Sequence, residues 1–299
     1  MTRLLELTRL VRLPMSVMDA GAGSNGLVGA PAAGLGAIGE FAVTCRGHPG
    51  PSGYLVDITV IDRAVRSTLP HRIAANLRQE AASGVPTDLT LFIHDAAEAL
   101  AASLPVELAS LAFRPNPFRE IRVERCPSAA TGTSHFPDQA THRAFDNATS
   151  KPMPNQAQSC QPTSTVMLCE SFEFAASHRL HLADRSDEEN RRLFGKCNNP
   201  NGHGHNYRIR VEVTPPTDAA GVGFGFPEIE SIVEAEVMTR FDHRHLNLDC
   251  PEFAETNPSV ENIARICHDL LAAAFTARGA RLQRVEVWET DKTSCRYPS

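Results

Sequence analysis

The sequence predicts an α+β fold in which one succession of strands and helices occurs twice. Apolar and polar residues alternate over 171–178 and 207–214, which indicates strands with one buried face. Apolar residues recur at helical spacing over 88–103 and 259–273, which indicates two amphipathic helices. The similar order of the two halves suggests a tandem duplication with a period of about 165 residues.

The first half begins with a strand over 1–14 and a Gly- and Ala-rich loop over 20–39. A strand over 41–45 follows, then the helix over 88–103 and a final strand over 118–125. Residues 126–163 are rich in Ser, Thr, Pro, Asn and Gln and have no apolar period, so they predict a flexible linker. The expected domains are therefore 1–125 and 164–299, joined by the linker 126–163.

The second half contains the two alternating strands and a short helix over 187–193. Pro227 stands where a first helical turn tolerates proline, and Ile229, Ile232 and Val233 continue that helix at helical spacing. Ser259 is the expected N-cap of the next helix, and Gly279 ends it. The last expected strand covers 282–290.

Composition restricts the class of protein. A chain of 299 residues suits two domains, and a net charge of −6 argues against a nucleic acid or a membrane surface as the main partner. No run of 18 apolar residues is present, and the segment 1–14 has the pattern of a strand rather than a signal peptide. Eight irregularly spaced cysteines fit reduced thiols, so we expect a cytoplasmic protein.

Three histidines fall on one strand parity. His203 and His205 precede the alternating run 207–214 on its buried side, and His178 has the buried parity of 171–178. If the two strands pair, the three imidazoles converge at one end of the sheet. A lone histidine there would be an ordinary core residue, but three neutral imidazoles with an open fourth position are typical of a catalytic zinc site.

A carboxylate and a thiol accompany the histidines. Glu289 lies on the apolar parity of the last strand, where an unpaired charge is costly, unless it reaches solvent at the strand end. Cys197 stands six residues before His203. A lone cysteine is usually a small buried hydrophobic residue, but a nearby metal makes it a candidate thiolate base.

Four segments carry a resemblance to a known family. They are Ala175–Leu180, Cys197–Tyr207 with the sequence Cys-Asn-Asn-Pro-Asn-Gly-His-Gly-His-Asn-Tyr, Phe241–Asn247 with Phe-Asp-His-Arg-His-Leu-Asn, and Val287–Asp291 with Val-Trp-Glu-Thr-Asp. Together, over about residues 167–299, the chain resembles the 6-pyruvoyl-tetrahydropterin synthase and 6-carboxy-tetrahydropterin synthase family. The resemblance implies a tunnelling-fold unit, which is an antiparallel four-stranded sheet with two helices on one face, assembled into a ring through its sheet edges.

The resemblance also implies roles for individual residues. His178, His203 and His205 would bind Zn²⁺; Cys197, Asp242 and His243 would transfer protons; and Glu289, Ser259 and Thr290 would contact the pterin substrate. The implied reaction converts 7,8-dihydroneopterin triphosphate to 6-pyruvoyl-tetrahydropterin with loss of triphosphate, as in tetrahydrobiopterin biosynthesis.

Whether Mg²⁺ helps to bind the triphosphate stays open, and Arg179, Arg244 and Lys196 are candidates for contacts with the triphosphate. His245 is expected to face solvent, and the segment Gly223–Pro227 departs from the family pattern before the first helix.

The first half has no equivalent chemistry. Aligning 53–65 with 221–233, 88–102 with 259–273 and 120–125 with 284–289 places Pro14, Ala37 and Gly39 at the histidine positions. The cysteine position falls near Pro31, and Arg125 takes the place of Glu289. His71 is either a relic of the Asp-His motif or an exposed loop histidine.

Two other functions compete with this one. A 6-carboxy-tetrahydropterin synthase of the queuosine (deazapurine) pathway would act on the same substrate, but the family's carboxy enzymes usually have a shorter loop than the five residues between Cys197 and His203. A non-catalytic pterin-binding scaffold is suggested by the degenerate first half. We expect a homo-oligomer formed through sheet edges, because unpaired edges invite association.

Overall fold

The computed structural model describes residues 4–15, 37–126, 164–216 and 224–299. The predicted loop over 20–39 and linker over 126–163 lie largely outside the described residues. Residues 37–39, which were expected to be loop, instead begin a strand. None of the helices in the described part is long and apolar enough to span a membrane.

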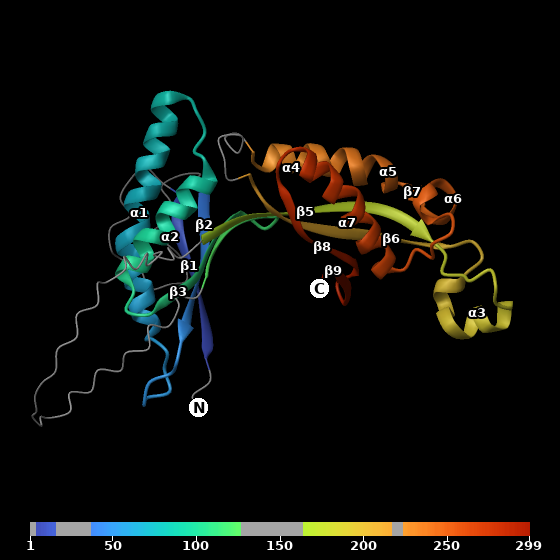
Figure 1. Cartoon of the computed structure of the whole chain (residues 1–299), viewed down its shortest axis with the longest axis horizontal. Coiled ribbons are helices and arrows are strands. Elements are labelled where there is room, and N and C mark those ends of the chain that lie inside the picture. The colour runs from blue at the N-terminus through green and yellow to red at the C-terminus, as the bar shows by residue number, and fades with distance from the viewer. Residues whose placement is uncertain (1–3, 16–36, 127–163, 217–223) are drawn as a thin grey trace, which may run out of the picture.

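Each half of the chain forms two strands, a helical layer and two more strands (Figure 1). The first unit consists of β1 (Leu5–Met15), β2 (Ala37–Gly47), α1 (Ile58–Ser83), α2 (Leu89–Ser103), β3 (Glu107–Asn116) and β4 (Arg119–Arg125). The second unit begins with β5 (Ser164–His178), α3 (Asp187–Phe194), the 3-10 helix Gly195–Asn198 and β6 (His203–Thr214). It continues with α4 (Phe226–Val233), the π-helix Glu234–Met238, α5 (Thr239–Phe241), β7 (Arg244–His245), α6 (Leu246–Asp249), the 3-10 helix Pro251–Phe253, α7 (Val260–Ala277), β8 (Arg281–Thr290) and β9 (Thr293–Tyr297).

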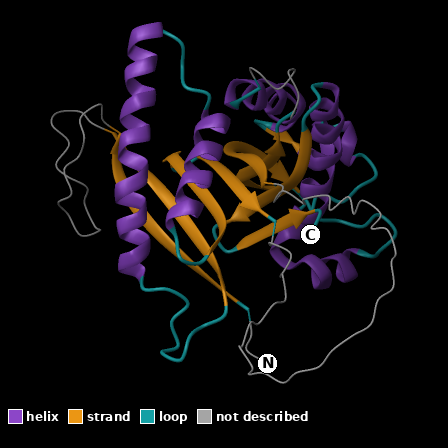
Figure 2. Ribbon diagram, turned by 60° about the vertical axis from the view of Figure 1, so that its left-hand side comes forward, coloured by secondary structure: helices purple, strands orange, loops and turns teal. Residues whose placement is uncertain are grey.

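The strands form one sheet in the order β1-β2-β3-β4-β5-β6-β8-β9, and β7 pairs with β5. Neighbours are antiparallel except β5 and β7, which are parallel. Figure 2 shows the helices of the first unit lying across its strands. The fold is therefore α+β and consists of two tandem tunnelling-fold units, each a four-stranded antiparallel sheet with its helices, and the two sheets are continuous through β4 and β5.

The helix starts repeat between the units. Asp57 caps α1 by accepting a hydrogen bond from the amide of Thr59, and Gly225 holds the same place before α4. Gly225 has no side chain to offer, but its own amide donates to the Glu228 carboxylate at 2.7 Å. Ser259 caps α7 as predicted. The unusual glycines before α4 thus do not prevent the helix from starting there.

Three strands, β3, β7 and β9, were not predicted from the sequence, and one alignment was wrong. β3 precedes β4 in the first unit, and β9 follows β8, so the segment 282–290 is not the last strand. By topology β3 is equivalent to β8 and β4 to β9. The match of 120–125 with 284–289 is therefore incorrect, because it equates β4 with β8.

The joint between the units is rich in ion pairs. Glu120 of β4 is almost fully buried, and it accepts hydrogen bonds from Arg114 of its own unit at 2.7 Å and from Arg210 of β6 at 3.2 Å. These arginines hold the pKa of the Glu120 carboxyl below its usual value, against the opposing effect of burial. The second unit is thus bound to the first by charge-assisted hydrogen bonds as well as by the β4–β5 ladder.

Arg119, at the start of β4, contacts both β5 and α4 of the second unit. Its Nε donates to Glu170 of β5 at 2.6 Å, its guanidinium pairs with Glu230 of α4, and its Cζ lies 4.8 Å from the centre of the Phe226 ring. Glu170 is only 4% exposed, and burial raises the pKa of its carboxyl while Arg119 opposes that rise. Arg119 therefore neutralises a buried charge across the joint.

Replacing Arg119 with alanine should lower the free energy of unfolding by about 2–4 kcal/mol, because Glu170 is left buried without its partner. Urea denaturation at pH 7 measures this change. Arg265→Ala is the control, since it removes only an exposed pair with Asp269 on α7 and should change stability by less than about 0.5 kcal/mol. Equal destabilisation by both variants would contradict the role given to Arg119.

Candidate active site

The register of β5 and β6 places three imidazoles together. His178 pairs with His203, and Ala176 pairs with His205, so all three rings project on the helix-covered side of the sheet that also holds Tyr207. One ligand nitrogen from each histidine lies within 4.8 Å of the others. The predicted convergence of His178, His203 and His205 is confirmed.

Hydrogen bonding orients the most deeply buried of these rings. Nδ1 of His178 lies 2.7 Å from the carbonyl oxygen of Pro258, which can only accept, so Nδ1 carries the proton. The hydroxyl of Tyr207 lies 3.3 Å from the same nitrogen. Nε2 of His178 is then the free ligand atom, and it lies 3.2 Å from Nε2 of His203. Such a backbone contact is the usual outer-shell support of a metal-binding histidine.

The cluster suits a metal ion. Burial and, less strongly, the neighbouring imidazoles lower the pKa of His178 to about 4, while the hydrogen bond to Pro258 opposes this change. Burial also lowers the pKa of His205, while Glu289 opposes that change. Both rings are neutral at pH 7, as metal ligands must be. Nδ1 of His203 and Nε2 of His205 are buried without a hydrogen-bond partner among the described residues. One nitrogen from each of the three imidazoles makes a ligand set that fits Zn²⁺.

Glu289 points into the cluster rather than to solvent. Its Oε1 lies 3.4 Å from Nε2 of His178 and 3.6 Å from Nε2 of His205, and its side chain is 18% exposed. The strand parity that predicted an inward carboxylate is correct. Among the described residues this half-buried carboxylate has no arginine or lysine partner, so it is available to accept two hydrogen bonds from a ligand.

Cys197 lies in the 3-10 helix that follows α3, and its side chain is half-buried. Its carbonyl oxygen accepts a hydrogen bond from the amide of Leu180 at 2.9 Å, which ties this helix to the end of β5. Burial raises the pKa of the thiol, and the Glu289 carboxylate raises it further. The polypeptide alone therefore favours the thiol, and a nearby cation is needed to favour the thiolate.

Four asparagines that the sequence analysis did not single out position the chain after His178. Each one hydrogen-bonds the backbone of a different residue in the stretch 179–182, and Asn190 and Asn198 are buried. The partners are Asn247 with both N and O of Arg179 at 2.8 and 3.0 Å, Asn198 with O of Leu180 at 2.7 Å, Asn257 with N of His181 at 3.1 Å, and Asn190 with N and O of Leu182 at 2.8 and 2.9 Å. The side chains come from four separate segments, so no local spacing could have revealed the set.

Asp242 and His243 form the expected pair. Oδ2 of Asp242 lies 2.9 Å from Nδ1 of His243, and its Oδ1 accepts from the amide of Ala175 at 2.8 Å. That amide is the main cause of the lowered pKa of Asp242. The amide of His243 donates back to the carbonyl of Ala175, and His243 has a φ of 57°, the turn that lets adjacent side chains meet.

The pair is not joined to Cys197 within one chain. Among the described residues, no hydrogen bond or ion pair links Asp242 or His243 to the thiol, and the His243 side chain is 82% exposed. The dyad is anchored at Ala175, whose parity on β5 is opposite to that of His178. The structure thus brings Cys197, Glu289 and the histidines together, and leaves Asp242 and His243 apart from them.

The remaining predicted residues surround the cluster. Ser259 directly follows Pro258 and is half-buried. Thr290 is exposed, and its hydroxyl accepts from the amide of Lys292 at 3.2 Å in the β8–β9 turn.

His245 was expected to face solvent, and this is wrong: its Nδ1 is buried, and its Nε2 is 2.8 Å from where Gly202 would carry a Cβ. Gly202, at a φ of 72°, is therefore needed both for its conformation and for space.

In the first unit, apolar residues occupy the positions that the histidine cluster and Glu289 occupy in the second unit. Met15 pairs with Ala37 as His178 pairs with His203, so Met15, rather than Pro14, takes the place of His178. Gly39 takes the place of His205, and a Cβ on it would lie 2.6 Å from the Phe113 ring and 2.8 Å from the Met15 sulfur.

The β2–β3 register gives Phe113 the place of Glu289, so the earlier assignment of Arg125 is wrong. The proposed cysteine position near Pro31 lies outside the described residues. His71 is exposed on helix α1 and is not in a loop. Among the described residues, the second unit alone has histidines with metal-ligand spacing.

The chain is similar to several known proteins. The family model for 6-pyruvoyl tetrahydropterin synthase matches residues 167–299. Human 6-pyruvoyl tetrahydrobiopterin synthase is 42% identical over 127 residues, which cover 42% of this chain and 86% of the human protein. The structure of Caenorhabditis elegans 6-pyruvoyl tetrahydropterin synthase is 33% identical, with a TM-score of 0.41, and the match covers 44% of this chain and 94% of that one. Uricase from Arthrobacter globiformis matches 99% of this chain and 92% of its own at 7% identity, with a TM-score of 0.45.

The second unit is thus a tunnelling-fold unit with a histidine, glutamate and cysteine site. At 42% identity over most of the human protein, the chain belongs to the 6-pyruvoyl tetrahydropterin synthase family, which is a family of enzymes.

The lowered pKa of His178 predicts an acid-sensitive metal-free protein. In the unfolded chain histidine binds a proton near pH 6.5, whereas His178 in the fold does so near pH 4. The unfolded state therefore binds more protons between these values, and stability should fall by roughly 3 kcal/mol as pH drops from 6.5 to 4. Urea midpoints of chelator-treated protein at pH 7, 5.5 and 4.5 measure the slope. His178→Asn should have a smaller slope, and identical slopes for the two proteins would contradict the assignment.

Proposed function

We propose that the second unit converts 7,8-dihydroneopterin triphosphate to 6-pyruvoyl-tetrahydropterin with elimination of triphosphate, as part of a tetrahydrobiopterin-type pathway. The observation that carries this proposal is the meeting of three histidines, an inward carboxylate and a thiol at one sheet end. The similarity to human 6-pyruvoyl tetrahydrobiopterin synthase supports the same reaction. The carboxy-forming alternative shares the site, and five residues between Cys197 and His203 favour the pyruvoyl product.

His178, His203 and His205 would hold Zn²⁺ through one ring nitrogen each, which for His178 is Nε2 because its Nδ1 binds the Pro258 carbonyl. When bound, zinc would polarise the side-chain hydroxyls of the substrate and acidify the carbons that bear them. Glu289 would accept hydrogen bonds from a pterin ring N–H and its exocyclic amino group, which orients the substrate's side chain toward the histidines. Ser259 would contribute a hydroxyl at the mouth beside Pro258, while the Thr290 hydroxyl is engaged in the β8–β9 turn.

Cys197 would remove a proton from the substrate's side chain, since it is the thiol next to Glu289 and the histidines. Its pKa is raised by burial and by Glu289, so the thiolate depends on the positive charge of a bound metal. In the dyad, Asp242 holds Nδ1 of His243, which leaves Nε2 as the atom that gives or takes a proton. Because the dyad lies apart from Cys197 in one chain, we infer that it acts on a site to which another copy contributes.

Cys197→Ala should reduce turnover by at least about a hundredfold while zinc content stays near the native value, because the base is lost but the ligands remain. His203→Ala should lose both turnover and zinc. Cys295→Ala is the matched control, since this free cysteine of β9 is also half-buried but lies outside the site.

Product analysis with 7,8-dihydroneopterin triphosphate checks the reaction. Acetaldehyde with 6-carboxy-tetrahydropterin would establish the alternative, and no product from fully zinc-loaded protein would indicate a scaffold.

Among the described residues, β1 and β9 are the end strands of the sheet, and this supports the proposed homo-oligomer. β4 and β5 already pair within the chain, so a further chain would join at β1 or β9. The first unit, whose site is filled by Met15 and Phe113, would then supply an interface rather than chemistry.

Native mass spectrometry with metal analysis should find an oligomer with one zinc per chain. The described part of the first unit holds no group of metal ligands, so His71→Ala should keep both the oligomer and the zinc. A monomer, or two zinc ions per chain, would refute this account of the first unit.

A further inference from the structure

The first unit contains a cavity between its helices and its sheet. The cavity has a volume of about 210 Å³ and is bounded by α1, α2 and the ends of β1 and β3. Met15 and Phe113, which occupy the positions of His178 and Glu289, both line it. These apolar side chains therefore replace the polar groups of the second unit but leave a space beside them.

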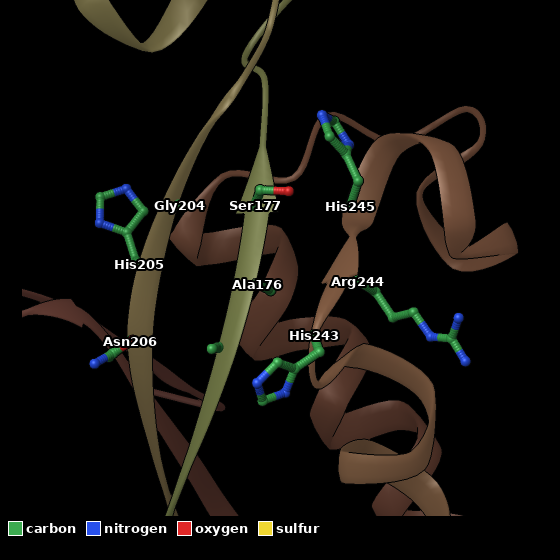
Figure 3. Close-up of a pocket in the computed structure, with 9 residues that line it drawn as sticks. Ala176, Ser177, Gly204, His205, Asn206, His243, Arg244 and His245 are labelled. Carbon is green, nitrogen blue, oxygen red and sulfur yellow. The ribbon is translucent and has the colours of Figure 1, made fainter.

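The position of Thr87 shows that this space is the counterpart of the histidine site. Thr87 lines the cavity and directly precedes the N-cap of α2, as Pro258, which binds His178, directly precedes the N-cap of α7. The open pocket of the second unit in Figure 3 is a different feature. Its Ser177 and Asn206 have the opposite parity on β5 and β6 to the histidines, so it lies on the other face of the sheet.

Apolar side chains form most of the cavity wall. Seven of the ten residues that line it have hydrocarbon, thioether or aromatic side chains. The rings of Phe92 and Phe113 meet edge to face, with their centres 6.1 Å apart. Since a dry cavity of about 150 Å³ can hold one benzene ring, this space suits one aromatic group.

A second cavity, of about 440 Å³, meets the first one between α1 and α2. The two cavities share four lining residues, which are Asn76, Glu80, Thr87 and Phe92. Among the described residues, neither lining contains a lysine, an arginine or a histidine, whereas the lining of the second cavity includes three carboxylates. The apolar cavity is thus bordered by negative charge.

Glu80 is the carboxylate that the two cavities share, and it is half-buried. Its Oε1 accepts a hydrogen bond from the amide of Thr87 at 2.6 Å, and its Oε2 has no hydrogen bond or ion pair among the described residues. The other two carboxylates are engaged, because Asp88 caps α2 and Asp95 pairs with Arg72 at 2.9 Å. A partly desolvated carboxylate without a cation gains most from a positively charged partner.

We propose that the first unit binds a small organic amine, whose aromatic body occupies the apolar cavity and whose ammonium group pairs with Glu80. A more polar ring would leave hydrogen-bonding groups unpaired against the apolar wall, and an anion would be repelled by the carboxylates. Asn76 offers the ammonium a second acceptor, because its Nδ2 donates to the Arg72 carbonyl at 3.0 Å and its Oδ1 has no partner among the described residues. This binding function is separate from the reaction proposed for the second unit.

Calorimetric titration of the full chain with 2-phenylethylamine tests the proposal, and 2-phenylethanol and 3-phenylpropionate are the neutral and anionic comparisons. The amine should bind about tenfold more tightly than the alcohol, and the acid should not bind detectably. Glu80→Gln keeps an acceptor for the Thr87 amide, so it should remove the advantage of the amine and leave the affinity for the alcohol unchanged. Equal affinities of the native protein for the amine and the alcohol would overturn the proposal.

Two controls locate the bound amine. Glu98→Gln removes the same charge from α2, where Glu98 pairs with Arg125 outside both cavities, and it should leave amine binding unchanged. Chelator-treated protein should bind the amine as tightly as zinc-loaded protein, because the binding takes place in the first unit. Loss of binding on removal of zinc would place the amine on the metal of the second unit and refute the proposal, as would equal losses in Glu80→Gln and Glu98→Gln.

Discussion

The antiparallel register of β5 and β6 is the constraint on which the site depends. It sets His178 opposite His203 and leaves His205 two residues further along the same face. A slip of one residue would send the imidazoles of one strand to the opposite face, because side chains alternate along a strand. The Pro258 carbonyl and the asparagines around 179–182 then hold the end of β5 in place. Every feature of the candidate site therefore depends on the pairing of β5 with β6.

The two units show that one architecture can be built with and without a histidine cluster. Met15, Gly39 and Phe113 fill the space that His178, His205 and Glu289 occupy in the second unit. Packing apolar side chains there carries no desolvation penalty, whereas burying imidazole groups without a metal to bind costs free energy. The sheet continues across β4 and β5, and the ion pairs of Glu120 and Arg119 bind the two units together.

Prediction from sequence succeeded where a residue's environment follows from strand parity. The histidines and Glu289 belong to long alternating strands, so their faces could be inferred. It failed for β9, a short exposed edge strand without apolar alternation, and for β3, whose buried residues include adjacent pairs. Because β3 was missed, the last strands of the two units were aligned incorrectly. Arg125 was therefore assigned to the position equivalent to Glu289, which Phe113 occupies. His245 was misplaced because a two-residue strand carries no period from which a face can be inferred.

The sequence by itself determined the elements that carry the chemistry, the inward parity of the ligands and the presence of one intact and one degenerate unit. These properties follow from local periodicity and residue type, which act over a few neighbouring residues. Only the tertiary structure decided that Asp242 and His243 lie apart from Cys197, that four distant asparagines hold one turn, and that Glu80 borders the cavity lined by Met15 and Phe113. Such relations join segments far apart in the chain, and their distances depend on how the strands and helices pack rather than on any local pattern.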